Sequence, residues 1–480
     1  MSSVRKSLSL GFAQTYSAMI FQFVASMLIA RLLVPHDLGI FSVAAVLVGL
    51  AQTVRAFGVP TYIVQEKELT EERIRSAMGV AILVGWVLAG VVALVSVPAA
   101  LFYREPGVRD VMLVLALNFL LMPFGSVTMA CLLREMNFVP QALASIASSA
   151  VQCVTAVGLA YLGFSYMSLA WASLASTLVL IIVAQIYRPP NLPYRPSFRE
   201  AKRVAKFGVM STSAFVVSDI TQGAPDLVVG RTISMEAVAL LGRANGLVQL
   251  FDKAVMNAVW RVAMPYFSVR DRAGADMSEA YLKSVSFITA LAWPFFVFLG
   301  LMAYPVIRIL FGTQWDASVP LVPYLCAAGM LGGPFLLGGS VLIAIGQIKE
   351  VMRPLIGIAV MQVSAVLIAS MWGIETVAAA YVGVAVVGMA WWYKTLQRVL
   401  GFTVRDFARS LRKSAAVTLC AVLLPIVVVM VSPPGPNNLW LPLVLAGFGA
   451  FIGWIGGIFG LHHPFREEIL RAFRHARNRR

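Results

Sequence analysis

The stretch SAMGVAILVGWVLAGVVALVSVPAALF, residues 76–102, decides the fold class because it contains no charged residue. The hydrocarbon core of a bilayer is about 30 Å thick, and about 20 helical residues cross it. Backbone polar groups that lie in lipid must form their hydrogen bonds within the segment, which only a helix allows for a single stretch. Residues 76–102 therefore predict a transmembrane helix.

Similar apolar runs recur along the 480-residue chain, of which 59% is hydrophobic and only 12% charged. A soluble domain carries about 25% charged residues, so this composition excludes an ordinary soluble protein. We expect an all-α integral membrane protein. About fourteen spans are predicted, near residues 8–33, 38–60, 76–102, 108–132, 139–162, 165–187, 207–230, 235–259, 284–311, 318–345, 352–373, 376–396, 413–432 and 439–461.

The 38 Lys and Arg residues are unevenly distributed between the two alternating sets of connections. One set holds only Arg31, Arg104, Arg109, Arg231 and Arg308. Because basic loops stay on the cytoplasmic side, both termini are predicted to be cytoplasmic in a multi-pass protein of the cell inner membrane. The net charge of +16 is then explained by loops facing anionic membrane lipids, which argues against a nucleic-acid partner.

The longest basic connection, residues 188–206, contains four prolines and is predicted to be a cytoplasmic linker. It separates two groups of six spans that place some polar residues alike: Gln52 and Gln249 lie at similar depths in the second and eighth spans. We expect two pseudo-symmetric six-helix lobes, an arrangement that transporters use. The predicted parts are an N-lobe at 1–187, a C-lobe at 207–400, helices 13 and 14 at 401–461 and a basic tail at 462–480.

The seventh span carries an acidic stripe, in which Asp219, Gln222 and Asp226 follow the i, i+3, i+7 spacing of one helix face. Pro225 should kink this helix because it cannot donate to Thr221. A charge in the middle of a membrane normally faces water or a partner. The stripe therefore predicts the wall of a water-lined cavity, or else acids that pair with a neighbouring arginine and hold helices together.

The eighth span places Asn245, Gln249 and Asp252 on one face and Arg243 on another. In the second span, Arg55 lies one turn from Gln52, although it is also close enough to the cytoplasmic end to extend to the headgroups. Arg55 and Arg243 thus occupy corresponding spans of the two lobes. The planar guanidinium fork binds phosphate oxygens in pairs, so these two arginines predict a pyrophosphate-binding site.

Several classes of site lack their sequence signals. The four histidines, His36, His462, His463 and His475, all lie outside the middle of a span, and the four cysteines lie inside apolar runs without a CxxC spacing. No GxxxxGK[ST] phosphate loop is present. We expect no enzymatic activity, no bound cofactor and no metal site.

Four local sequences resemble one family of transporters. Ala30–Phe41 (ARLLVPHDLGIF) resembles its turn between the first two helices, and Phe57–Pro60 with Ile63–Gln65 its next stretch. Leu133–Phe138 (LREMNF) is similar to its Arg-x-Met-x-Phe connection, and Phe311–Trp315 (FGTQW) to its FG-x-x-W after the ninth helix. They occur in the family's order. The family is the Wzx-type oligosaccharide flippases of the multidrug/oligosaccharidyl-lipid/polysaccharide exporter superfamily.

The resemblance implies twelve core helices in two lobes and alternating access. It also implies a lipid-linked oligosaccharide as substrate, with cavity arginines near its pyrophosphate, and polysaccharide polymerase and export proteins as possible partners. Asp219, Asp226 or Asp252 could couple transport to H⁺ or Na⁺. Two alternatives stay open: a multidrug/cation antiporter of the same superfamily, and a non-transporting scaffold of a polysaccharide assembly complex.

Overall fold

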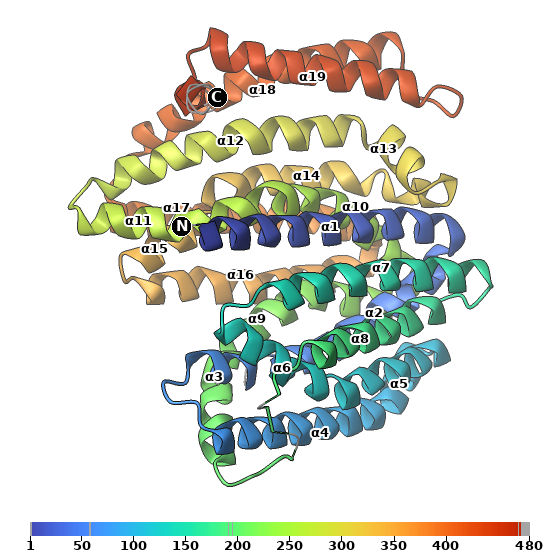
Figure 1. Cartoon of the computed structure of the whole chain (residues 1–480). Helices are drawn as coiled ribbons and strands as arrows, with labels where there is room; N and C mark the ends of the chain where they lie inside the picture. Colours follow the sequence, from blue (N-terminus) through green and yellow to red (C-terminus); the bar gives the residue numbers. More distant parts are fainter. Residues whose placement is uncertain (1, 57–58, 191, 194, 469, 472–480) are drawn as a thin grey trace. The chain divides into compact units, whose positions relative to one another are not determined.

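The computed structural model of the chain is built from helices, and its described residues form no β-strand (Figure 1). The structure describes residues 2–56, 59–190, 192–193, 195–468 and 470–471. The chain divides into two compact units, Met1–Ala239 (unit 1) and Leu240–Arg480 (unit 2). Phe57 and Gly58 of the second family-like sequence, and the end of the predicted tail, lie outside the described residues.

Unit 1 contains nine helices and the beginning of a tenth within the described part. They are α1 (Ser2–Leu32), α2 (Pro35–Ala56), α3 (Val59–Gln65), α4 (Glu71–Tyr103), α5 (Pro106–Leu121), α6 (Pro123–Arg134), α7 (Val139–Tyr161), α8 (Met167–Ile186), α9 (Ala201–Thr232) and α10 (Met235–Phe251), which continues into unit 2. Helix α4 begins where Thr70 accepts a hydrogen bond from the Arg73 backbone, and it ends where Arg104 adopts a left-handed conformation.

Unit 2 continues from α10 with a π-helical turn and then long antiparallel helices. Its elements are η1 (Asp252–Met256), α11 (Asn257–Arg272), α12 (Met277–Leu301), α13 (Ala303–Leu310), η2 (Thr313–Ser318), α14 (Leu321–Gly332), η3 (Gly333–Phe335), α15 (Gly338–Ala344), α16 (Ile348–Ala369), η4 (Ser370–Trp372), α17 (Ile374–Leu400), α18 (Val404–Val431) and α19 (Trp440–Gly460).

The structure confirms the all-α multi-pass class, and a helical segment lies at each of the fourteen predicted spans. Among the described residues, ten helices are long and apolar enough to cross a membrane, or eleven if the bent pair α5–α6 is one span. Helices α9 and α10 are not among them: α10 has 17 residues, and α9 carries several charged and polar residues. Fourteen membrane crossings therefore stay a prediction.

Several spans are broken rather than straight. Helices α5 and α6 meet at an angle of 49°, where Pro123 begins α6 and cannot continue the hydrogen bonding of α5. The eighth predicted span changes from α10 to the π-helical η1 and then to α11. Breaks of this kind in membrane helices are tolerated where protein or water, rather than lipid, surrounds the backbone.

The core of unit 1 joins α3, α4 and α6, and two of the family-like sequences meet there. Arg134 donates hydrogen bonds to the carbonyl oxygens of Ile63 (2.7 Å), Glu66 (2.5 Å) and Lys67 (3.3 Å). These carbonyls lie at the end of α3, where a helix leaves its last acceptors without internal partners. The arginine of the LREMNF sequence therefore caps the helix that contains Ile63–Gln65.

Helix α9 packs against α2, α3 and α4 and so belongs to unit 1 by its contacts. No helix forms between Ile186 and Ala201 in the described residues, in keeping with the prolines there. The described part of this connection is held to α4, because Ser197 donates its hydroxyl to Glu72 (2.5 Å) and its backbone N–H to Arg75 (3.0 Å). Contacts between neighbouring helices do not test an internal repeat, and the predicted lobe bounds stay a prediction.

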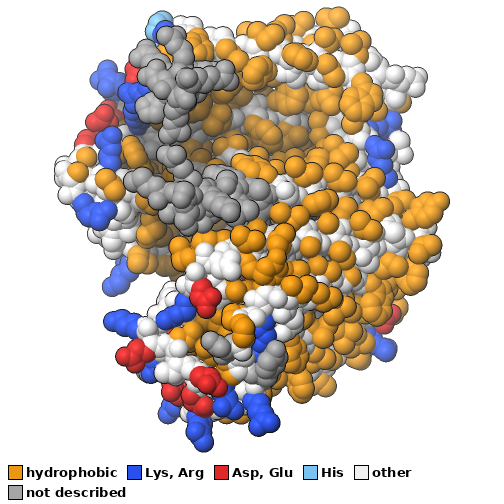
Figure 2. Space-filling view, in the orientation of Figure 1, with side chains coloured by type: hydrophobic (Ala, Val, Ile, Leu, Met, Phe, Trp, Pro, Cys, Tyr) orange, Lys and Arg blue, Asp and Glu red, His pale blue; other side chains and the backbone are white. Residues whose placement is uncertain are grey.

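Charged side chains of unit 1 gather at the helix ends. In Figure 2, acidic and basic groups crowd the end that holds α3 and the start of α4, and hydrophobic side chains cover the helix lengths. Leu94 and Leu101 of α4 are 77% and 74% exposed. Such exposure would be unfavourable in water and is expected of residues that face lipid.

Unit 2 has a buried polar cluster on α12 and α18. His463, which is 1% exposed, lies 3.0 Å from the Ser286 hydroxyl and 3.2 Å from the Ser414 hydroxyl through Nε2. Its Nδ1 accepts the backbone N–H of Phe465 at 3.1 Å, so the neutral ring carries its proton on Nε2. This cluster fastens the segment after α19 to the helices beneath it.

Candidate functional site

The α2–α9 pair of unit 1 places several of the predicted residues together. The two helices are closely packed at Gly223, where an added Cβ would lie 2.5 Å from the Val46 Cγ1 atom. Thr53, which is 7% exposed, donates its hydroxyl to Asp219 and also contacts the Gly49 carbonyl at 3.2 Å. Asp219 is therefore held by α2, and it forms no ion pair with a described residue.

Arg55 lies in the last turn of α2, two residues after Thr53. Its Nη2 donates to the Gln52 side-chain oxygen at 3.1 Å, as the one-turn spacing of the two residues allows. Its Nε is buried without a hydrogen-bond partner among the described residues. A buried guanidinium donor that lacks a partner is costly, and an anion placed there would satisfy it.

The rest of the acidic stripe continues along α9. Gln222 is exposed and Asp226 is half-buried, with no ion pair to Asp226 in the described part of the chain. Pro225 lies inside α9 as predicted, and the helix continues through it. Two residues after Pro225, the Leu227 carbonyl accepts a hydrogen bond from the Tyr103 hydroxyl of α4 at 3.2 Å, which fixes this part of α9 to α4.

In unit 2, Arg243 of α10 lies over two aromatic rings. Its guanidinium carbon is 5.1 Å from the centre of the Phe311 ring and 4.9 Å from that of Trp315. Phe311 is 4% exposed and Trp315 is fully buried. A cation over an aromatic face is attracted by the ring quadrupole, and more strongly when water is excluded. The family-like sequence Phe311–Trp315 thus forms the support for one of the two predicted arginines.

A strong ion pair holds that aromatic support in place. Arg308 donates from Nε and Nη2 to both carboxylate oxygens of Asp316, at 2.5 to 3.1 Å. Bidentate pairs of this kind are geometrically specific. They link α13 to η2, the two elements that flank Gly312. Sequence reasoning used Arg308 only for the charge distribution and did not name Asp316, although both lie within three positions of the FGTQW sequence.

The remaining predicted residues lie on α10 and at the start of η1. Asn245, Gln249 and Asp252 are half-buried. Asp252 begins a π-helical turn, in which its carbonyl accepts the Asn257 N–H five residues later. Single π-turns are rare in helices and are frequent at functional sites. Sequence reasoning did not predict this irregularity.

The predicted site residues thus fall into two groups, each within one unit. Unit 1 brings Arg55 beside Gln52, and Asp219 beside Thr53. Unit 2 places Arg243 on Phe311 and Trp315. Sequence reasoning missed Thr53. The signal that could have identified it is the complementarity between a hydroxyl on α2 and a carboxylate on α9.

Comparison with known proteins identifies the family of this chain. Residues 28–320, which include all four family-like sequences, match the family described as "Polysaccharide biosynthesis protein". This chain belongs to that polysaccharide biosynthesis family. The match covers more than half of the chain, and the resemblance identified from the four local sequences is confirmed.

Two relatives with names in polysaccharide biosynthesis and transport are distantly similar to the chain. The succinoglycan biosynthesis transport protein ExoT of Rhizobium meliloti (strain 1021) is 26% identical over 310 residues, covering 63% of this chain and 62% of that protein. The lipopolysaccharide biosynthesis protein WzxC of Escherichia coli (strain K12) is 22% identical, covering 66% and 65%. The chain therefore matches slightly less than two thirds of the length of these relatives.

Solved structures show which fold this family member has. The lipid II flippase MurJ in an inward closed conformation is similar with a TM-score of 0.73 at 13% identity, covering 96% of this chain and 100% of that one. An inward-facing multidrug resistance MATE family transporter is similar with a TM-score of 0.60 at 15% identity, covering 81% and 96%. The chain has the fold of these transporters.

Proposed function

We propose that this chain is a flippase that moves a polyprenyl-pyrophosphate-linked oligosaccharide across the cytoplasmic membrane by alternating access. The exported product would be a cell-surface polysaccharide, such as the O-antigen of lipopolysaccharide, a capsule or an exopolysaccharide. The family supports this proposal, and so do relatives named for succinoglycan biosynthesis transport and for lipopolysaccharide biosynthesis. The fold of a lipid II flippase supports it too.

The observation that carries the proposal is the half-buried Arg55 in the last turn of the membrane helix α2, whose Nε is buried and lacks a partner among the described residues. A single charge in the middle of a bilayer costs about 2.5–3.5 kcal/mol on insertion scales. A pyrophosphate carries more than one charge, so it cannot cross without cations. Arg55 supplies a fixed cation with an N–H donor available for a phosphate oxygen.

In the proposed mechanism, Arg243 is the second cation for the pyrophosphate. The Phe311 and Trp315 rings lie against its guanidinium and hold the positive charge in place. We propose that Arg55 and Arg243 serve one substrate during the cycle. The sugar headgroup would travel with the pyrophosphate while the polyprenyl tail stays in lipid.

The polar residues of α9 and α10 are proposed to line the path and to couple it to an ion gradient. Asp219, Asp226 and Asp252 carry the carboxylates that could bind H⁺ or Na⁺, and Gln222, Asn245 and Gln249 add neutral polar groups. Asp219 already accepts a hydrogen bond from Thr53, so a change in the charge of Asp219 would change its contact with α2.

The uneven distribution of basic loops supports placing both termini in the cytoplasm, with the protein in the cell inner membrane. Transport would be non-enzymatic and would need no bound cofactor. Polysaccharide polymerase and export proteins are the proposed protein partners, because a flipped oligosaccharide must be polymerised and exported.

The test is complementation of a strain that lacks the chromosomal copy. Arg55→Ala and Arg243→Ala should leave lipid-linked oligosaccharide accumulated on the cytoplasmic side and stop polymer export. Arg412→Ala, which changes an exposed arginine of α18, should restore export at a matched protein level. Normal export by both site variants would refute the flippase mechanism.

The same strain separates the two alternatives. A scaffold would tolerate Arg55→Ala and Arg243→Ala but fail when cytoplasmic loops are shortened. A cation antiporter would depend on Asp219 and Asp226 rather than on the arginines, and it would confer resistance to cationic drugs. Dissipating the proton or sodium gradient in flipping assays tests the proposed coupling, which unchanged transport would exclude.

A further inference from the structure

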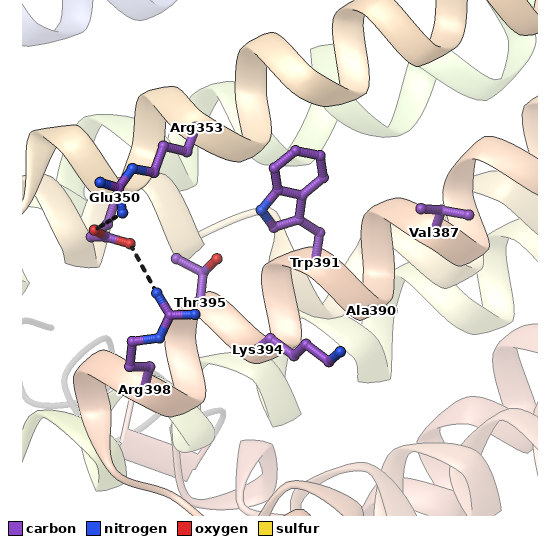
Figure 3. A pocket seen from close by; sticks show the side chains of 8 residues that line it. All are labelled: Glu350, Arg353, Val387, Ala390, Trp391, Lys394, Thr395 and Arg398. Carbon is purple, nitrogen blue, oxygen red and sulfur yellow. Dashed lines mark hydrogen bonds and ion pairs between the residues drawn. The ribbon is translucent and has the colours of Figure 1, made fainter.

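A pocket of about 310 Å³ lies on unit 2 between α16 and α17, away from the residues discussed so far (Figure 3). It is lined by Glu350, Arg353, Val387, Ala390, Trp391, Lys394, Thr395 and Arg398. Two of these residues come from the first turns of α16 and six from the second half of α17.

The pocket is strongly basic. It holds three cations, Arg353, Lys394 and Arg398, and one carboxylate, Glu350. Glu350 is the common partner of both arginines: Arg353 Nη1 lies 2.8 Å from one carboxylate oxygen and Arg398 Nη1 lies 3.9 Å from the other. One carboxylate thus orients two guanidinium groups toward the same space (Figure 3).

Lys394 adds a cation that no carboxylate neutralises within the described residues. Its exposed side chain extends from the next turn of α17 after Trp391. The pocket therefore keeps a net charge of two positive, which attracts an anionic group. Arginine forks and a lysine ammonium together suit a phosphate.

The other end of the pocket is apolar. Val387 and Ala390 lie on the far side of the Trp391 ring from Glu350 and Arg398 (Figure 3). The ring packs on the α16 backbone at Gly357, where an added Cβ would come within 2.2 Å of the indole. Trp391 is 39% exposed and Val387 is 48% exposed, as expected at a membrane boundary.

We propose that this pocket binds one anionic phospholipid, with its headgroup phosphate among Arg353, Lys394 and Arg398 and an acyl chain along Val387 and Ala390. A basic pocket between membrane helices is a recurring binding site for anionic lipid headgroups. The apolar wall favours a lipid over a free phosphate, because a soluble anion would gain nothing from Val387. This lipid site does not depend on the proposed flippase activity.

The experiment measures lipid binding to the full-length purified protein. Native mass spectrometry would compare phosphatidylglycerol, which is anionic, with phosphatidylcholine, which is zwitterionic. We expect the wild type to retain one phosphatidylglycerol at concentrations where phosphatidylcholine is lost. Lys394→Gln and Arg398→Gln should each weaken phosphatidylglycerol binding about fivefold. This factor corresponds to the attraction that one Lys or Arg near a membrane surface exerts on anionic lipid.

Arg412→Gln is the matched control, since Arg412 is an exposed arginine of α18 outside the pocket lining. It should bind phosphatidylglycerol as the wild type does. An equal loss in Arg412→Gln, or no preference for phosphatidylglycerol in the wild type, would overturn the site.

Competition with inorganic phosphate and pyrophosphate distinguishes a site for a phospholipid headgroup from a site for a soluble phosphate. A lipid site predicts that millimolar phosphate or pyrophosphate displaces little phosphatidylglycerol. Efficient displacement by either anion would show a site for a soluble phosphate group and would refute the lipid assignment. Melting curves of each variant in detergent show that the pocket variants remain folded.

Discussion

The sequence predicts Arg55 and Arg243 as a pair from their places in corresponding spans, but the structure holds them differently. Within the described part of the chain, the Arg55 side chain has one hydrogen bond, to Gln52, and a buried Nε without a partner. Arg243 lies on the faces of two buried aromatic rings. The first arrangement leaves binding capacity in the plane of the guanidinium, whereas the second fixes the position of the whole group.

The difference indicates that stability and transport should respond differently at the two arginines. Removing a cation whose hydrogen bonds are incomplete costs little in the empty protein. Removing one that fills an aromatic site leaves rings without their cation and opens a cavity. The predictions below use this contrast, beginning with the largest effect.

Arg55→Ala should reduce the initial rate of flipping in proteoliposomes about 100-fold, the loss expected when a buried anion loses its charged partner. Its thermal midpoint in detergent should not fall, because the buried Nε has no described partner to lose. Arg55→Lys, which keeps the charge without the planar fork, should retain an intermediate rate. A lowered midpoint with an unchanged rate would reverse the assignment of roles.

Arg243→Ala should destabilise the protein by about 2 kcal/mol, the value of a desolvated cation–aromatic contact. The readout is the thermal midpoint measured without substrate. Phe311→Leu should lower the midpoint in the same direction, since it removes one of the two rings. The two variants combined should be less destabilising than the sum of both, because they remove the same contact. Strict additivity would contradict this account.

Gly223→Ala should destabilise the α2–α9 pair by about 1 kcal/mol, because the new methyl group would meet Val46 in a close-packed interface. The displaced α9 would also weaken the hydrogen bond between Asp219 and Thr53. Gly49→Ala on α2 is the control: no atom lies within 4 Å of its added Cβ, so alanine should be neutral or stabilising there. Equal midpoints for both variants would show that the helices are not closely packed.

His463→Gln should change how stability depends on pH while leaving transport intact. Burial and the nearby Lys413 lower the pKa of His463 from 6.5 to about 4. As the pH falls, His463 therefore takes up a proton in the unfolded chain before it does so in the folded protein. The contribution of the neutral, buried His463 to the free energy of unfolding is complete above pH 6.5 and declines as the pH falls toward 4. The variant should show a smaller decline in thermal midpoint over this range. If transport by His463→Gln still depends on pH, that dependence arises from titratable groups other than His463.

Much of the fold could be predicted because membrane helices leave a strong signal in one dimension. The uncharged run at 76–102 lies within α4, and the predicted run at 439–461 coincides with α19 to within a residue or two. The signal was weaker at α9 and α10, whose polar residues lower their hydropathy. There the polar spacing located the candidate site but could not show how its side chains are held.

The site itself was only partly predictable. Asp219, Arg55 and Arg243 are charged residues inside predicted spans, so their cost in a bilayer marks them. The residues that contact them have no comparable signal in the sequence. Thr53 and Phe311 are ordinary residues for a membrane helix or its end, and they matter only because folding places them against a carboxylate and a guanidinium.

By itself, the sequence determined the class, the helical segments and the family, because hydropathy, charge bias and short motifs depend on residues close together in the chain. Only the tertiary structure decided that Arg134 caps α3, that Thr53 holds Asp219 and that Trp315 supports Arg243. These contacts join residues up to 166 positions apart, and their energies depend on distance and orientation in space. Sequence order carries neither quantity.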